Sequence, residues 1–358
     1  MAKIIVTGTG SAQSNSVIRC LKMDEEPNEI IGLGSDKYDL MLSPADRKIL
    51  IPYSTDPHYR ECLLSVLREE KADMIHFQHD KELLVASAFR EEIADSGIQM
   101  FIPDHETIEI CVHKYKTWEK FRDAGMKVPR NMIIHTQEDL RHSFEEFGST
   151  IWLRSMAVGG GGLGSLAAHS FGEACEWIEK AKGWGTFLAA ELLNGKTVTW
   201  QSIWDHGELI VAQGRRRHSW AFGALSASGV TGITRVCETI SDKTVDEVGM
   251  AACRAVCDAP HGVFGVDMTY DFTGFPNPTE INIGRFFTTV RFFAEAGLNL
   301  PVIIKDICLY GKKPKLKEVL NPLPDHLLWI RGMDEQPRLT TEKEIETTLL
   351  RRNNEKEL

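Results

Sequence analysis

A short apolar segment that ends in an arginine runs into a loop with an unusual run of glycines. The segment is 151–154, and the run comprises Gly159, Gly160, Gly161 and Gly162. Consecutive backbone N–H groups in such a loop can bind an anion, because glycine has no Cβ to prevent close approach. Arg154 beside the loop would add a planar, permanently charged ligand for phosphate. A flexible linker is the alternative, but the flanks are not rich in Ser, Pro or charge, which favours a phosphate site.

Further along the chain, two carboxylates and an amide have the spacing of one face of a β-hairpin. Residues 266–270 alternate between apolar and polar, a turn rich in Gly, Pro and Asn follows, and 279–283 is the predicted return strand. Alternate residues of a strand share a face, so Asp267, Glu280 and Asn282 could point the same way. Their oxygens suit Mg²⁺ held jointly with substrate phosphates. The alternative is a hairpin whose polar face is simply exposed to solvent. The glycine loop upstream makes this alternative less favoured.

The order of these residues resembles the ATP-grasp ligases, and the likeness covers about residues 1–310. It is carried by Lys114, Arg154, the glycine run, Glu191, Asp267 and the motif Glu280-x-Asn282-x-x-Arg285. The chain is most similar to a single synthetase unit of the carbamoyl phosphate synthase large chain. It departs from that pattern where Ile283-Gly284 replaces a single Pro before Arg285, and where Asp267 replaces a frequent Gln.

The resemblance implies ATP and Mg²⁺ as cofactors, with Mn²⁺ as the alternative metal. It implies Asp267, Glu280 and Asn282 as metal ligands, and Arg285 and Arg154 as catalytic residues at the transferring phosphoryl group. The implied nucleotide ligands are Lys114, Arg154, Gly159 to Gly162, Glu191 and Leu193. Lys116 is the nearby alternative to Lys114. The family often has a further Glu that holds the ribose, and Lys196-Thr197-Val198-Thr199 stands in its place here.

The reaction implied by the resemblance joins a carboxylate to an amine, or to a thiol, through an acyl phosphate. The substrates would be small molecules, and three alternatives stay open. The first is a bicarbonate-activating enzyme like carbamoyl phosphate synthase, and the second is a non-catalytic nucleotide-binding protein of the same fold. The third is an NAD-dependent oxidoreductase, which Gly8-Thr-Gly10 after the first strand suggests weakly, because the last glycine of that fingerprint is missing.

Further arginines are candidates for binding the substrate. Residues 214–220 contain the basic cluster of an acidic chain, and Arg215 and Arg217 within it could hold a carboxylate or phosphate. Arg291 is a third candidate. The segment 222–232, rich in Gly, Ala and Ser, is predicted to be a mobile loop that excludes water from the reactive intermediate.

Composition indicates an ordinary soluble protein without nucleic-acid or membrane partners. The chain has 358 residues, 42% of them hydrophobic and 26% charged, and its formal net charge of −10 argues against a general nucleic-acid binder. No apolar run approaches the roughly 18 residues that span a bilayer. The eight cysteines are scattered, which is typical of reduced thiols, and the first residues run directly into a strand without a signal peptide. We therefore expect a cytoplasmic protein. A homodimer is the alternative to a monomer.

Alternating strand and helix patterns predict an α/β protein with an ATP-grasp fold. Residues 1–112 are expected to form a Rossmann-like domain with a parallel sheet. Within this domain, the segment 81–94 is expected to be one uninterrupted helix. Residues 113–190 would form a small α/β lobe, and 191–311 a large α+β lobe with an antiparallel sheet and the metal hairpin. A charged C-terminal extension, 312–358, would end in a solvated helix over 342–358.

Overall fold

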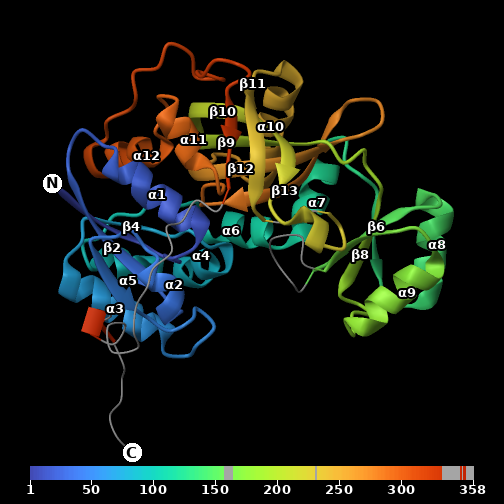
Figure 1. The fold of residues 1–358 in the computed structure, drawn as a ribbon, viewed down its shortest axis with the longest axis horizontal. Helices are drawn as coiled ribbons and strands as arrows, with labels where there is room; N and C mark the ends of the chain where they lie inside the picture. Colours follow the sequence, from blue (N-terminus) through green and yellow to red (C-terminus); the bar gives the residue numbers. More distant parts are fainter. Residues whose placement is uncertain (157–163, 230–231, 333–346, 349, 352–358) are drawn as a thin grey trace, which may run out of the picture.

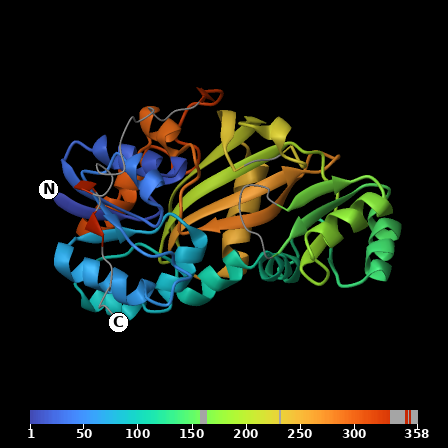
Figure 2. The same ribbon diagram turned by 60° about the horizontal axis from the view of Figure 1, so that its bottom comes forward.

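The computed structural model describes residues 1–156, 164–229, 232–332, 347–348 and 350–351 of the chain. The strands of these residues form three sheets that follow one another along the long axis of the molecule (Figures 1 and 2). A five-stranded sheet lies at one end, a six-stranded sheet in the middle and a four-stranded sheet at the other end. The predicted α/β class is confirmed.

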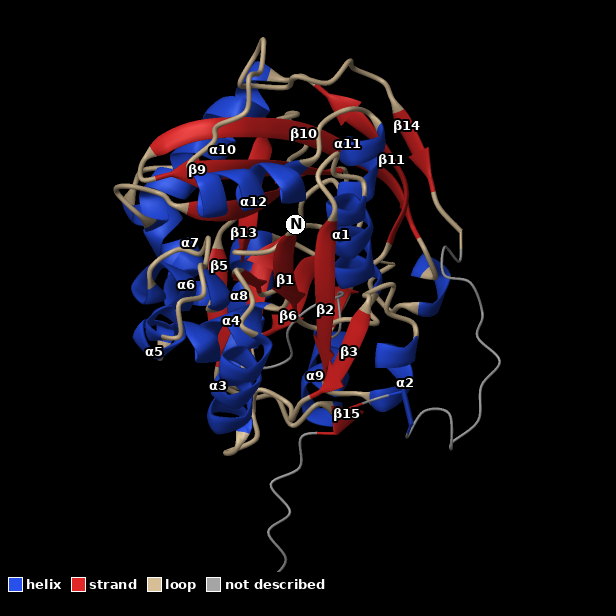
Figure 3. Ribbon diagram, turned by 90° about the vertical axis from the view of Figure 1, so that its left-hand side faces the viewer, coloured by secondary structure: helices blue, strands red, loops and turns tan. Residues whose placement is uncertain are grey.

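The N-terminal sheet is parallel, with strand order β15-β3-β2-β1-β4. Helices cover both of its faces, as Figure 3 shows from the side, and this arrangement is the one that alternating strands and helices predict. The strands are β1 (Ala2–Val6), β2 (Asn28–Gly34), β3 (Arg47–Leu50), β4 (Met74–His76) and β15 (Leu350–Arg351). The helices are α1 (Ala12–Lys22), α2 (Lys37–Met41), α3 (Tyr59–Glu70), α4 (Asp80–Ser87) and α5 (Arg90–Asp95).

The six-stranded sheet has strand order β13-β12-β9-β10-β11-β14 and all its pairings are antiparallel. The strands are β9 (Thr197–Asp205), β10 (Glu208–Trp220), β11 (Thr234–Ile240), β12 (Gly262–Tyr270), β13 (Pro276–Ile283) and β14 (Leu328–Ile330). The associated helices are the 3₁₀ turn η1 (Gly223–Leu225), α10 (Lys243–Val256), α11 (Val290–Glu295) and α12 (Leu300–Tyr310). The hairpin of β12 and β13 confirms the two strands predicted around the metal motif.

The four-stranded sheet forms a small lobe with its own core. Its strands, in the order β5-β8-β6-β7, are β5 (Asn131–Ile134), β6 (Ile151–Ser155), β7 (Ser165–Ala168) and β8 (Phe187–Glu191). Helices α8 (Gln137–Phe147) and α9 (Phe171–Lys180) pack on this sheet. Two further helices, α6 (His105–Val112) and α7 (Lys114–Asp123), lie between the first sheet and the small lobe.

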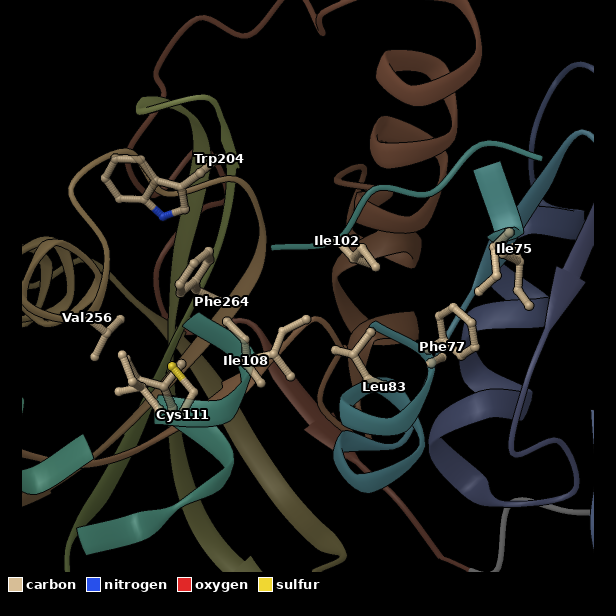
Figure 4. Packing of buried hydrophobic residues seen from close by; sticks show 14 of the residues in the cluster. Ile75, Phe77, Leu83, Ile102, Ile108, Cys111, Trp204, Val256 and Phe264 are labelled. Carbon is tan, nitrogen blue, oxygen red and sulfur yellow. The ribbon is translucent and has the colours of Figure 1, made fainter. Parts of the chain in front are cut away.

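A continuous apolar core joins the N-terminal sheet to the six-stranded sheet. Figure 4 follows it from Ile75 of β4 and Phe77 just after that strand, through Ile108 of α6, to Trp204 and Phe264 of the middle sheet. These side chains are fully buried. By contrast, the small lobe buries a separate apolar cluster. The two larger sheets are therefore packed as one body, to which the small lobe is attached as a second.

Two local predictions were wrong. The helix expected over 81–94 is divided into α4 and α5, because Phe89 leaves helical geometry (φ −125°, ψ 32°) and buries its ring in the shared core. The C-terminal helix is contradicted at 350–351, which form β15 on the open edge of β3. An unpaired strand edge offers free N–H and C=O groups, and a short segment can pair with them.

All eight cysteines are free thiols. Among the helices of the described residues, none has both the length and the apolar character that a bilayer span requires. The aromatic residues that follow β13 lie in the core: Phe286, Phe287, Phe292 and Phe293 are all buried.

Helix α10 packs on the middle sheet through a contact that requires glycine. A Cβ added at Gly249 would lie 2.4 Å from the buried ring of Trp200, whose indole N–H donates to Asp246 at 2.8 Å. We expect Gly249→Ala to lower the free energy of unfolding by about 1–3 kcal/mol, as overpacking does, measured by urea denaturation. Gly172→Ala in α9 is the control, because its Cβ would meet no atom within 4 Å. Equal stability of the two variants would contradict the packing argument.

Candidate active site

A cavity of about 480 Å³ lies between the small lobe and the six-stranded sheet. One wall comes from β6, β8 and the first turns of α7, and the other from β10, β12 and β13. The cavity brings together seven of the residues predicted from the sequence, from both sides of this junction. They are Lys114, Arg154, Glu191, Leu193, Arg217, Asp267 and Glu280.

The hairpin of β12 and β13 has the register that was predicted from the sequence. Asp267 of β12 is the direct partner of Glu280 in β13, and both side chains line the cavity. Asn282, two residues further, donates its side-chain N–H to Asp267 Oδ2 at 3.1 Å. The predicted common face of Asp267, Glu280 and Asn282 is therefore present. The register shifts only after Asp267, where a β-bulge precedes Met268.

Asp267 is held as a carboxylate by its neighbours. Burial alone would raise the pKa of the Asp267 carboxyl. Arg217 at 3.1 Å and the Thr199 hydroxyl at 2.5 Å both donate to its Oδ1. Together with Arg215 and Asn282, these partners lower the pKa of the carboxyl below its usual value. Thr199 in turn accepts a hydrogen bond from Arg215 at 2.8 Å. Asp267 is therefore a charged carboxylate that lines the cavity and whose Oδ1 is fixed by hydrogen bonds.

Arg154 enters the cavity from the opposite wall. Its Nη1 donates to the backbone oxygen of Thr279 at 3.4 Å, and its buried Nε has no hydrogen-bond partner among the described residues. Burial lowers the pKa of the guanidinium, while the charge of Glu280 raises it. An unpartnered N–H on a buried guanidinium requires an acceptor to offset its desolvation, and an anion in the cavity would provide one.

Lys114 is the first residue of α7, directly after the helix cap His113. It lines the cavity and has no hydrogen-bond or ion-pair partner within the ranges that the structure describes. The alternative, Lys116, pairs with Glu109 at 2.6 Å and does not line the cavity. The geometry therefore favours Lys114 as the cation that is available to a ligand.

The predicted adenine contacts lie at the end of β8. Glu191 accepts from Arg130 Nε at 3.2 Å, so its carboxylate already has a cationic partner. Leu193 follows it on the cavity wall, with Trp118, Trp152 and Trp220 also among the lining residues. The predicted phosphate loop Gly159 to Gly162 lies outside the described residues, but Ser155 and Ser165 on either side of it line the cavity.

Three predicted arginines do not line the cavity. Arg285 is bound to Asp80 at the start of α4 and to the side-chain oxygen of Asn282. Arg215 is 1% exposed and donates hydrogen bonds to Thr289 and Thr199. Its guanidinium carbon lies 4.3 Å from the centroid of the Phe287 ring. Burial lowers the pKa of this guanidinium to about 10.

Arg291 is the third of these arginines. It pairs with Glu295 at 2.7 Å on α11, where both residues line a separate cavity of about 300 Å³. Of the three arginines proposed for substrate binding, only Arg217 reaches the main cavity.

Comparison with known proteins identifies the fold. No protein-family model matches the chain. The biotin carboxylase domain of 2-oxoglutarate carboxylase from Hydrogenobacter thermophilus aligns with a TM-score of 0.68 and 17% identity, over 92% of this chain and 73% of that one. Carboxyaminoimidazole ribonucleotide synthase from Aspergillus clavatus gives 0.66 and 13%, over 89% and 79%. L-amino acid ligase from Bacillus licheniformis gives 0.65 and 13%, over 87% and 74%.

The chain has the ATP-grasp fold. A more local sequence likeness links it to the beta subunit of the ADP-forming succinate–CoA ligase of a Nitratiruptor species, with 26% identity over 91 residues. The aligned part is 25% of this chain and 22% of that subunit, so the match spans less than a quarter of the relative.

Several side chains at or near this cavity were not predicted from the sequence. Thr199, on β9, donates its hydroxyl to Asp267. In the sequence, Thr199 was named only as part of the segment that stands in place of the missing ribose ligand. Trp118 lines the cavity and donates its indole N–H to the backbone oxygen of Pro129. Asp80 pairs with Arg285, and this pairing has no local sequence signal. All three depend on contacts between segments that are separated in the sequence.

The interaction of Arg217 with Asp267 predicts a pH-dependent stability. Because the folded pKa of Asp267 is lowered, its stabilisation is complete above the unfolded pKa of about 3.9 and is lost as the pH falls through the folded value. Arg217→Gln should therefore cost about 3 kcal/mol of unfolding free energy at pH 7 and less at pH 3.

Urea denaturation at the two pH values measures this difference. The matched control is Arg216→Gln on the opposite face of β10, where Arg216 binds Glu238 with a 40% exposed side chain and should contribute less than about 1 kcal/mol. A loss for Arg217→Gln that is the same at both pH values would show that the Asp267 charge is not involved.

Proposed function

We propose that this chain is an ATP-dependent ligase that activates a small carboxylate as an acyl phosphate and transfers the acyl group to an amine. The observation that carries the proposal is the convergence of two paired carboxylates, Asp267 and Glu280, with Arg154 and Lys114 around one cavity. Oxygen ligands on one wall and cations on the other are what a magnesium–triphosphate complex requires.

The residues of the hairpin fit Mg²⁺, or Mn²⁺ as the alternative. Asp267 is kept ionised, Glu280 lies beside it, and Asn282 is within hydrogen-bonding distance of Asp267. The side-chain oxygen of Asn282 accepts from Arg285 and retains a second lone pair. When bound there, the metal would neutralise charge on the β- and γ-phosphates.

The protein residues contribute positioning and charge rather than a covalent nucleophile. Lys114 and Arg154 would hold the ATP phosphates, together with Gly159 to Gly162. Glu191 and Leu193 would bind the adenine. Arg217 both fixes Asp267 and borders the cavity, which makes it the best placed of the predicted substrate arginines.

The proposed reaction has two steps. A substrate carboxylate oxygen attacks the γ-phosphorus of ATP, the bond from that phosphorus to the bridging oxygen breaks, and ADP leaves. An amine nitrogen then attacks the acyl carbon, phosphate leaves and the amine loses a proton. Arg285 remains our candidate for stabilising the transferring phosphoryl group. In the structure it is bound to Asp80, so this role would require exchange of that partner.

The proteins of similar fold support this class of reaction. The Hydrogenobacter domain was solved with MgADP, ADP and bicarbonate, and the Aspergillus synthase with ATP. The Bacillus protein is an amino acid ligase, and the local sequence relative is an ADP-forming ligase of succinate and CoA. Bicarbonate activation, as in a carbamoyl phosphate synthase-like unit, and transfer to a thiol are therefore retained as variants of the proposal.

Replacing Glu280 tests the metal assignment. We expect Glu280→Gln to abolish Mg²⁺-dependent phosphate release from ATP while the fold is kept, because the amide preserves shape but removes the charge. Phosphate release is measured with a pooled library of carboxylates and amino acids, and folding by circular dichroism. Asp271→Asn, at the turn of the same hairpin but outside the cavity, is the control that should retain turnover. Full activity of Glu280→Gln would refute the role of the hairpin.

Replacing Arg154 tests the phosphate contact. Hydrogen bonds to charged groups contribute about 1.5–3 kcal/mol, so Arg154→Ala should weaken ATP binding by about 10–100-fold. Calorimetric titration with Mg²⁺ present measures the affinity. Arg141→Ala, whose guanidinium lies over Phe171 on the helical side of the same lobe, is the control. Unchanged affinity in Arg154→Ala would remove that residue from the nucleotide site.

A further inference from the structure

A second group of metal-binding side chains lies at the opposite end of β9 from the candidate active site. Asp205 is the last residue of β9, and His206 forms the turn into β10. His261 directly precedes β12. The cavity borders the other end of β9 at Thr197, eight residues away, which is about 25 Å along a strand.

The three side chains come from two loops that are held together. The backbone N–H of Gly207, in the β9–β10 turn, donates to the oxygen of Pro260 at 2.7 Å. This contact fixes the turn that carries His206 against the loop that carries His261. The potential ligands are therefore presented by a connected pair of loops rather than by one exposed segment.

The donor atoms have the separations that a bound cation needs. His261 Nδ1 lies 3.5 Å from Asp205 Oδ1, and His206 Nε2 lies 3.9 Å from the same oxygen. One donor atom from each residue can be chosen so that all three lie within 4.8 Å of one another. Ligands that surround Zn²⁺ tetrahedrally at about 2.0–2.2 Å are roughly 3.4 Å apart, so the separation of His261 and Asp205 already fits and the His206 donor must move closer.

His261 has an imidazole nitrogen without another role. Its Nδ1 is buried and makes no hydrogen bond to any residue that the structure describes. The ring is packed between Phe101, at a centroid distance of 4.5 Å, and His206, at 4.2 Å.

We propose that Asp205, His206 and His261 bind a divalent transition-metal ion of the Zn²⁺ class, with water at the remaining position. Imidazole ligands favour such ions, whereas the oxygen ligands of the hairpin favour Mg²⁺. The ion would fasten the β9–β10 turn to the loop before β12, independently of nucleotide. It would thus be a structural site beside the strands that carry the proposed active site.

Two neighbouring features define what binding requires. Lys313 approaches Asp205 at 3.4 Å, but it does so at Oδ2 and also binds Glu208 at 2.5 Å, so Oδ1 remains directed at the two histidines. The rings of His206 and His261 are stacked at 13°, which places their nitrogen lone pairs in nearly parallel planes. The His206 ring must therefore turn toward the ion, and its 82% exposed side chain has room to do so.

Titration of the untagged full chain with Co²⁺ tests the site, because Co²⁺ with nitrogen ligands absorbs visibly and Zn²⁺ displaces it. We expect one equivalent to bind, with or without ADP, and Glu280→Gln to bind it equally well. His261→Gln and Asp205→Asn should each weaken binding about tenfold or more. His142→Gln is the matched control, since His142 faces a single carboxylate, Glu145, at 3.7 Å.

The outcomes separate the proposal from a simple histidine–carboxylate contact. If His261→Gln unfolds, His206→Gln replaces it, because that turn side chain is largely exposed. Loss of the Co²⁺ absorbance in either folded variant, with retention in His142→Gln, supports the site. Absence of binding by the wild-type chain, or equal binding by the histidine variants, overturns it. Loss of binding in Glu280→Gln alone would assign the ion to the hairpin instead.

Discussion

The antiparallel register of β12 on β13, which sets Asp267 opposite Glu280, is the constraint on which the candidate site depends. A slip by one residue would move one carboxylate to the other face of the sheet. Arg217 and Thr199, from β10 and β9, bind the same carboxylate oxygen of Asp267 and so connect the hairpin to the rest of the sheet. Concentrating this charge in a partly buried site is costly unless each charge is paired.

The separation of the apolar cores has a consequence for how a ligand would be enclosed. The N-terminal and six-stranded sheets share one core, while the small lobe has its own. The cavity lies at the border between these two bodies, where Arg154 reaches across to the backbone of Thr279. A polyanion bound in this cavity would contact both bodies and would therefore link the small lobe to the rest of the molecule.

Sequence patterns predicted those parts of the site that lie on one strand or one turn. The hairpin, its three polar residues and the arginine at the end of β6 follow from alternation and glycine spacing. Sequence analysis also proposed Arg215 and Arg291 near a substrate, and the family resemblance implied Arg285 at the transferring phosphoryl group. Each of these arginines already has a partner: Thr289, Glu295 and Asp80 respectively. A charged residue in a motif does not reveal whether its charge is already paired, because the partner can lie anywhere in the chain.

The sequence by itself determined the α/β class and the hairpin of β12 and β13 that carries Asp267 and Glu280, since these depend on local periodicity. Tertiary structure alone decided which cations face the cavity and that Phe89 interrupts a helix to reach the core. It also brought Asp205, His206 and His261 together, although 55 residues separate the two histidines. Pairing, burial and convergence depend on the packing of distant segments, and a local pattern does not contain that information.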